Sequence, residues 1–435
     1  MHKRIPVVQR NFVGIRCARC ASSIPVSSSS PVCHKCGGRL EVIMDLDSTK
    51  KDVTKESFNA STTRGVWRYR LLLPCMNPKA IVCLGEGNTN LLLTESLAQV
   101  LGSKRLFVKD ETTNPSGAFI DRGTTVDISR ARALGFRAAA CGWSGNLASS
   151  VAAYCARGGL RSRAYLPGQI DLGKLYQTVA YGAEIVPCST REEAFASLCE
   201  NQEEYYPVTA RNPFFLEGVK TTGIEVAEQM DWNPPDWMIV PMGNGSHVAM
   251  THKGLKEIET LGIIDRDRTR LVGVQMEGCS PIADMFKRTP KKSKYSSCSF
   301  ARDIAIENPS MAEEAVRAIA SSRGDAVVVT EKEVLNAVEL LAKSEGIFAE
   351  PASASTIAAL RKMLESGAID RSESVVCVVT GIGLKDPMMA RSIAYRNKAA
   401  RNMISRFEES LPAKRIGTTK LKILSILGDG ENYAY

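Results

Sequence analysis

The feature that most constrains the fold of this chain is a regular alternation of short β-rich runs with helix-length segments between about residues 80 and 390. The runs that read as buried strands are 106–109, 137–141, 164–166, 184–187, 237–240, 271–275, 326–329 and 375–379. Segments with a helical pattern lie between them at 145–157, 174–181, 217–230, 331–343 and 353–364. This alternation predicts an α/β architecture, in which helices cover both faces of parallel sheets. In such folds ligands bind at the carboxyl ends of strands, against helix N-termini.

The composition excludes several classes of protein. Hydrophobic residues make up 44% and charged residues 24% of the 435 residues, which is typical of a folded chain and not of a disordered one. No apolar run approaches the ~20 residues that span a bilayer, and residues 1–10 lack the apolar core of a signal peptide. We therefore expect a cytoplasmic protein without a membrane partner. The net charge of +9 is only mildly basic and does not favour nucleic acid as a partner.

Two C-x-x-C pairs stand near the N-terminus. Cys17 and Cys20 form the first pair, and Cys33 and Cys36, followed by two glycines, form the second. Two pairs at this spacing can place four thiolates tetrahedrally around one Zn²⁺, so residues 1–45 are predicted to form a zinc ribbon. A segment this short, without a hydrophobic core of its own, would need the metal to fold. The alternative is a vestigial ribbon whose thiols hold no metal.

Four segments of the α/β region carry motifs that occur together in one enzyme family. They are residues 110–123 (DETTNPSGAFIDRG), 143–146 (WSGN), 241–246 (PMGNGS) and 380–387 (TGIGLKDP). In this order they resemble the signature loops of threonine synthases and related fold-type-II pyridoxal-phosphate (PLP) enzymes. The resemblance implies two interleaved parallel-sheet domains over residues 46–394, with a smaller α/β domain at about 100–200. The N-terminal zinc ribbon also occurs in threonine-synthase-like proteins.

The resemblance assigns the cofactor phosphate to the loop formed by Gly243, Asn244, Gly245, Ser246 and His247. The residue types support this assignment. Glycines allow a backbone to close on an anion, and the segment from His247 onward is predicted to be a helix, whose N-terminus favours negative charge. The alternative is an ordinary glycine-rich turn between a strand and a helix.

Further roles are implied for two other loops. The substrate carboxylate would bind at Trp143, Ser144 and Gly145, whereas Asn146 would donate a hydrogen bond to the 3-oxygen of the cofactor. Thr380 would face the pyridine nitrogen, and a hydroxyl there would leave that nitrogen largely unprotonated. The alternatives are structural: Ser144 could cap the predicted helix, and Thr380 could cap its strand.

The chain departs from the family at the position that matters most for chemistry. Where the resemblance requires the Schiff-base lysine, this sequence has Ile120. An aliphatic side chain has no nucleophile and no titratable proton, so PLP is expected to be held only non-covalently. Other family residues are also replaced, by Ala118, Trp143, Ser246 and His247. Several departures in one pocket favour a remodelled site over a single-codon lesion or an engineered change.

Three functions therefore remain open. The favoured one is a threonine-synthase-like protein that is catalytically impaired, or a pseudoenzyme, and binds a small phosphorylated amino acid or a PLP-like ligand. The second is an active PLP-dependent lyase that makes threonine or a related amino acid from a substrate such as phosphohomoserine. The third is a regulatory protein using the ribbon, the basic loop Pro290–Lys294 and the tail 395–435, which resembles the first helix of PadR-type winged-helix domains. The resemblance also allows a homodimer.

Overall fold

The computed structural model describes residues 11–168, 170–289, 295, 301–396, 401–404 and 406. Its contacts divide the chain into residues 1–387 and a C-terminal unit of residues 388–435. The predicted basic loop Pro290–Lys294 lies outside the described residues, as does most of the predicted tail. The C-terminal unit contains most of helix α15 (Pro387–Arg396). In the described part of the chain, no helix is long and apolar enough to cross a membrane.

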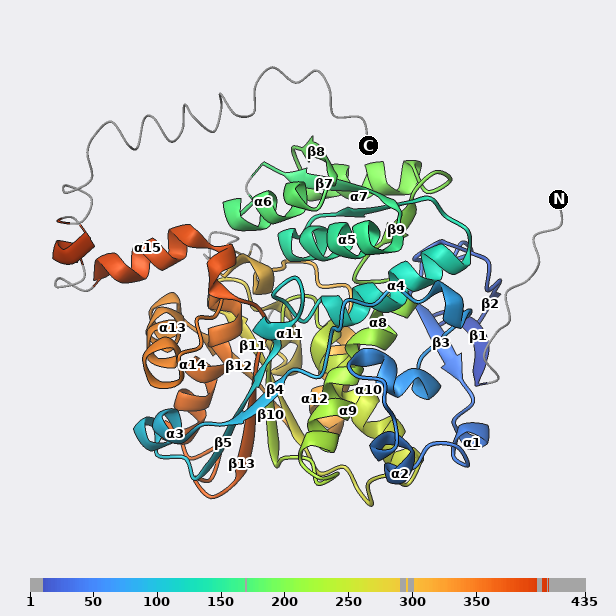
Figure 1. The fold of residues 1–435 in the computed structure, drawn as a ribbon. Coiled ribbons are helices and arrows are strands. Elements are labelled where there is room, and N and C mark those ends of the chain that lie inside the picture. Colours follow the sequence, from blue (N-terminus) through green and yellow to red (C-terminus); the bar gives the residue numbers. More distant parts are fainter. Residues whose placement is uncertain are drawn as a thin grey trace, which may run out of the picture. The chain divides into compact units, whose positions relative to one another are not determined.

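The larger of the two α/β sheets has six strands in the order β12-β11-β10-β13-β5-β4 (Figure 1). The strands are β4 (Asn90–Leu93), β5 (Arg105–Asp110), β10 (Trp237–Pro241), β11 (Arg270–Met276), β12 (Asp325–Val329) and β13 (Ser374–Val379). Neighbouring strands are parallel, except that β4 pairs antiparallel with β5 at one edge. Every residue of β10 and β13 is buried, as expected for central strands covered on both faces. The predicted α/β class is confirmed.

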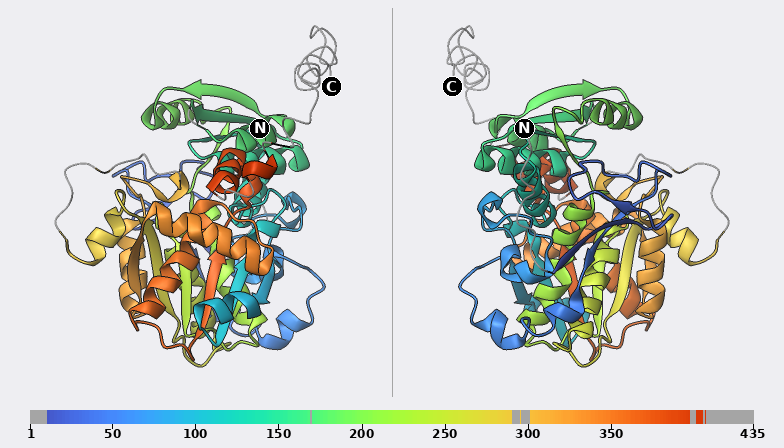
Figure 2. Two further views of the ribbon diagram at one scale, coloured as in Figure 1. Left: turned by 90° about the vertical axis from the view of Figure 1, so that its left-hand side faces the viewer. Right: turned by 90° about the vertical axis from the view of Figure 1, so that its right-hand side faces the viewer.

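Helices lie on both faces of this sheet (Figure 2). One face is covered by α14 (Pro351–Glu365), on which α13 (Glu331–Glu345) and then α3 (Glu95–Leu101) pack. The other face carries α9 (Thr221–Gln229), α10 (Ser246–Thr260), α11 (Pro281–Phe286) and α12 (Ala312–Ser321). The segment 217–230, predicted as one helix, is divided between α8 (Pro213–Val219) and α9. Lys220 separates them but is itself helical, with φ −59° and ψ −23°.

The smaller sheet has four parallel strands in the order β8-β7-β6-β9. They are β6 (Ala138–Gly142), β7 (Arg161–Pro167), β8 (Glu184–Cys188) and β9 (Tyr206–Val208). Helices α4 (Asp121–Ala133), α5 (Gly145–Gly158) and α6 (Leu172–Ala180) accompany it, together with α7 (Arg191–Glu200). Alternate residues of β6 belong to two different apolar clusters, Ala139 with α5 and Ala138 with α7. This alternation is what a strand covered on both faces requires.

The N-terminal segment forms a three-stranded antiparallel sheet of β1 (Phe12–Cys17), β2 (Ser23–Ile24) and β3 (Leu40–Met44). The expectation that this segment lacks a hydrophobic core needs a correction. Phe12 and Leu40 are buried in an apolar cluster that also contains Trp67 and Phe214 of the adjacent domain. The rings of Phe12 and Phe214 meet edge to face with centroids 5.6 Å apart. The segment therefore draws part of its stability from this shared core.

A cluster of buried charges joins several elements near the carboxyl end of β5. Arg122, at the start of α4, is fully buried, and its guanidinium lies 2.7 Å from carboxylate oxygens of both Glu111 and Glu225. Lys109 on β5 lies 2.6 Å from the same Glu225. Buried charges are tolerated only when they are paired and hydrogen-bonded, so these residues must be ordered together.

We predict that Arg122→Met lowers the free energy of unfolding by about 3–5 kcal/mol, because it leaves two buried carboxylates without their main counter-charge. The matched control is Arg161→Met on β7, which removes an ion pair to Glu204 whose side chains are 66% and 56% exposed. That change should cost about 1 kcal/mol or less. Urea denaturation followed by circular dichroism measures both. Equal effects of the two substitutions would contradict the structural role assigned to Arg122.

Candidate functional site

The glycine-rich loop after β10 is held in close contact with a distant segment of the chain. A Cβ atom at Gly243 would lie 2.3 Å from the carbonyl oxygen of Asp303, and one at Gly245 would lie 2.6 Å from that of Met311. Gly245 also has a φ of +87°, in the left-handed region that favours glycine. The segment from Asp303 to Met311 therefore packs directly on the loop, and both glycines are required by this approach.

The backbone of this loop offers donors for an anion. The N–H groups of residues 243–247 have no hydrogen-bond acceptor among the described residues. They lead into α10, a helix of 15 residues whose N-terminus carries a partial positive charge. The side chain of Asn244 has a different task, because its Oδ1 accepts hydrogen bonds from the backbone and the hydroxyl of Ser310 at 2.7 and 2.9 Å. Free N–H groups at a helix N-terminus fit a phosphate group.

An aromatic stack connects this loop to the loop that carries residue 120. The imidazole of His247 lies parallel to the ring of Phe119, with centroids 4.0 Å apart and an interplanar angle of 1°. Its Nε2 is 3.2 Å from the hydroxyl of Thr222, and its Nδ1 has no partner in the described part of the chain. Burial lowers the pKa of His247 to about 3, so the ring is neutral at physiological pH.

Ile120 immediately precedes α4 and is half-buried against the core of the smaller domain. Its loop runs beside the loop that follows β13. The N–H of Phe119 donates to the carbonyl of Thr380 at 2.9 Å, and the N–H of Ile382 donates to the carbonyl of Gly117 at 3.0 Å. Position 120 thus adjoins the other loops, but it supplies no amine to which a cofactor aldehyde could bond.

The hydroxyl of Thr380 is buried and pairs with another hydroxyl. Its Oγ1 lies 2.9 Å from Oγ of Ser353, at the start of α14, and the N–H of Gly381 donates to the same Ser353 oxygen at 2.8 Å. The side chain therefore takes part in a buried hydrogen-bond network, beyond the strand capping considered as an alternative. Ser353 was not identified from the sequence.

Asn146 lies at the centre of a charged cluster between the two domains. Its Nδ2 donates to Glu350 at 3.0 Å, and its Oδ1 accepts from Nζ of Lys385 at 2.9 Å. Nζ of Lys174, on α6, lies 3.0 Å from Glu350 and 2.6 Å from Asp303. Sequence reasoning missed the charged members of this cluster, although Lys385 stands inside a motif that the family resemblance rests on.

Trp143 and Ser144 lie at the edge of the cluster, before α5. Trp143 has a φ of +94°, a strained conformation for a bulky residue, and the guanidinium of Arg191 lies 3.5 Å from its ring centroid. Ser144 is the residue before the first turn of α5, but its side chain makes no capping hydrogen bond. Ser144 thus occupies the N-cap position of α5 without contributing a side-chain cap.

These contacts connect most of the residues predicted from the sequence. The loop of Ile120 adjoins the loop of Thr380, and its Phe119 ring stacks on His247, while Asp303 contacts both Gly243 and Asn146.

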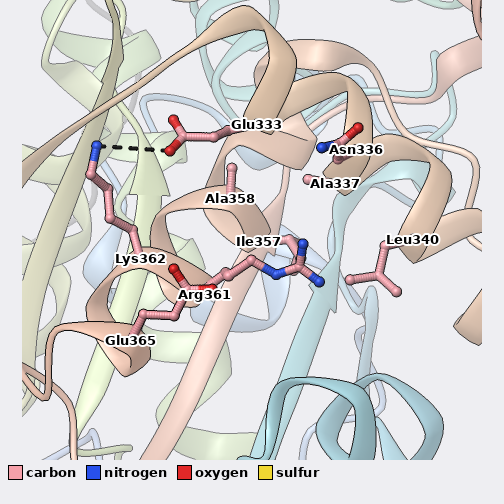
Figure 3. Close-up of a pocket in the computed structure, with 9 residues that line it drawn as sticks. All are labelled: Glu333, Asn336, Ala337, Leu340, Ile357, Ala358, Arg361, Lys362 and Glu365. Carbon is pink, nitrogen blue, oxygen red and sulfur yellow. Dashed lines mark ion pairs between the residues drawn. The ribbon is translucent and has the colours of Figure 1, made fainter.

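A hollow between α13 and α14 is a separate feature (Figure 3). It is lined by residues such as Glu333, Arg361 and Lys362, and by none of the residues of the candidate site.

The four cysteine sulfurs of the N-terminal sheet form a compact cluster. All lie within 4.8 Å of one another, with Cys17 3.6 Å from Cys36 and Cys20 3.7 Å from Cys33. A tetrahedron built on Zn–S bonds of about 2.3 Å has S···S edges of about 3.8 Å. The donor set and its spacing therefore fit a zinc ion.

Comparison with known proteins agrees with the fold and with the family resemblance. A family model described as pyridoxal-phosphate dependent enzyme matches residues 82–381. The threonine synthase of Methanocaldococcus jannaschii is 42% identical over 378 residues, covering 86% of this chain and 93% of that protein. The threonine synthase of Methanosarcina acetivorans is 38% identical over 383 residues, covering 86% and 92%. Among solved structures, maize serine racemase gives a TM-score of 0.61 at 20% identity and covers 71% of this chain and 92% of its own.

For the cysteine cluster we predict about one zinc ion per chain in protein purified without chelator, measured by inductively coupled plasma mass spectrometry. Cys36→Ser should reduce the zinc content at least tenfold, because a hydroxyl is a poor substitute for a thiolate ligand. Cys199→Ser, a cysteine of α7 outside the cluster, serves as the control and should keep the full content. Wild-type protein without zinc would refute the metal site.

Proposed function

The chain belongs to the threonine synthase family of pyridoxal-phosphate-dependent enzymes, and we propose that it binds PLP or another small phosphorylated ligand without performing the threonine-forming reaction for which its relatives are named. Two features support the proposal: Ile120 stands where the resemblance requires the Schiff-base lysine, and the N–H groups of residues 243–247 have no acceptor among the described residues. Ligand binding and catalysis depend on different residues, so binding can persist when catalysis is impaired.

The backbone of residues 243–247 would hold the phosphate. Phosphate binding here depends on N–H groups and on the dipole of α10, neither of which involves residue 120. Asn146 would hold the 3-oxygen of the ring, and Thr380 would face the ring nitrogen. Bound PLP supplies an electron-accepting ring that stabilises negative charge on a substrate carbon.

The loss at position 120 removes both a nucleophile and a proton carrier. In enzymes that use a general base, that group alone accelerates the reaction by about 10²–10⁴-fold. The half-buried Ile120 packs with the core of the smaller domain, so its side chain contributes to the packing of the site. Trp143 adds bulk at the start of α5, where the substrate carboxylate would bind. Together these features support the proposal that the protein binds a phosphorylated ligand but is impaired in catalysis.

Ser246→Asp tests the phosphate loop. Ser246 is the first residue of α10, and a carboxylate there interacts favourably with the helix dipole but repels a bound phosphate. We expect the affinity for PLP, measured by isothermal titration calorimetry, to fall at least tenfold while the melting temperature does not fall. Ser246→Asn, which is similar in size and neutral, should keep the affinity of the wild type. Unchanged affinity in Ser246→Asp would place the phosphate elsewhere.

Restoring a lysine at position 120 distinguishes a single-codon lesion from a site in which several residues have been remodelled. We predict that Ile120→Lys alone produces no measurable threonine from phosphohomoserine, because Trp143 still stands at a position that the resemblance assigns to the substrate carboxylate. Adding Trp143→Ser should allow an amino-acid substrate to shift the absorbance spectrum of the bound cofactor. Trp143→Ser without the lysine is the control and should form no threonine. Robust threonine formation by the single Ile120→Lys variant would contradict the remodelling hypothesis, and turnover by the unmodified protein would overturn the proposed function.

A further inference from the structure

One buried lysine in this structure differs from the others in its partners. The lysines buried in the described part of the chain are Lys109, Lys174, Lys220 and Lys385. The first three each have a carboxylate oxygen 2.6 Å from Nζ. Lys385 has no carboxylate within 4.0 Å among the described residues, and its Nζ lies 2.9 Å from Oδ1 of Asn146 and 3.4 Å from Oγ of Ser149. A buried amine with neutral partners is held less firmly in its charged form than one in an ion pair.

Lys385 also lies beside the loop that leads to Ile120, the position where the resemblance places the Schiff-base lysine. It ends the short helix η5 (Gly383–Lys385), five residues after Thr380. Its side chain runs along the loop that leads to Ile120, since a Cβ atom at Gly117 would lie 3.4 Å from Cε of Lys385. From there it reaches Asn146 on α5. The amine therefore enters the site between the residue-120 loop and the helix that would hold the ring oxygen.

We propose that Lys385 supplies the amine that position 120 lacks and forms a covalent bond with the aldehyde of PLP. The inference rests on the proposed function, in which Asn146 holds the 3-oxygen, because the aldehyde carbon is attached to the neighbouring ring position. In this step the nitrogen of Lys385 adds to the aldehyde carbon, a carbon–nitrogen double bond forms, and the aldehyde oxygen leaves as water. No oxidant or reductant is needed. This proposal differs from the expectation of purely non-covalent binding, and the trapping experiment below distinguishes the two.

The electrostatic surroundings of Lys385 are consistent with a reactive amine. Burial lowers the pKa of Lys385 to about 8, although Glu350, Asp121 and Asp303 oppose the shift and Lys174 adds to it. The neutral form is the nucleophile. The initial rate of bond formation should therefore rise as pH approaches 8 and level off above it, whereas the rate for an exposed lysine continues to rise toward its ordinary pKa of about 10.4.

The test is chemical trapping followed by peptide mapping. Full-length protein is incubated with PLP and then with sodium cyanoborohydride, which reduces the carbon–nitrogen double bond, and the digest is analysed by mass spectrometry. We expect one phosphopyridoxyl group on Lys385. Lys385→Arg keeps a positive charge and a donor for Asn146, and should reduce the labelling of this peptide at least tenfold. Lys362→Arg changes a lysine of the α13–α14 hollow that is 51% exposed, and should leave the labelling of Lys385 unchanged.

Binding measured in parallel keeps the two proposals distinguishable. If calorimetry detects PLP binding that Ser246→Asp weakens, but the label is absent from Lys385 or is spread over exposed lysines, the role of Lys385 is overturned and the proposed function stands. If PLP does not bind at all, the role of Lys385 fails together with the proposal that PLP is the ligand of this site. Should Lys385→Arg fail to fold, the peptide map of the wild-type protein still decides, because it locates the label without any variant.

Discussion

A fully buried arginine fixes the geometry on which the candidate site depends. Arg122 follows Ile120 by two residues and is paired with Glu111, just after β5, and with Glu225 on α9. Three elements from distant parts of the sequence must therefore assemble before its charge is compensated. The loop that carries Ile120 is held in place by this requirement, whatever side chain stands at position 120. The scaffold around the candidate site can thus be retained independently of the side chain at position 120.

Much of the fold could be predicted from the sequence because parallel strands are buried on both faces and form continuous apolar runs. All the runs named as strands are strands in the structure. The strands that were missed are short or lie at edges: β9 has three residues and contains Pro207, and β4 is a four-residue antiparallel edge strand. The strands of the N-terminal sheet are also hard to predict, because β2 has only two residues and β3 is only partly buried.

The site was only partly predictable, for a physical reason. Its loops could be found because each is a contiguous motif between a strand and a helix. The cluster around Asn146 is formed instead by charges from separate segments, and Asp303 and Lys174 carry no local pattern that marks them. Lys385 was within a recognised motif, but the sequence alone cannot show that its amine is buried without a carboxylate partner. That property appears only when the surrounding residues are placed in space.

The shared core between the N-terminal sheet and its neighbouring domain links two equilibria. Phe12 packs on Phe214 in the cluster that also contains Trp67, and Cys17 and Cys33 are members of the same cluster. Any ligand that binds only the folded form stabilises it, and the effect is reciprocal. The affinity of the four cysteines for a metal ion would therefore include a contribution from the packing of the adjacent domain, and a substitution at Phe214 would weaken metal binding without changing a thiolate. The metal content of the N-terminal sheet would therefore depend on whether the adjacent domain is correctly folded.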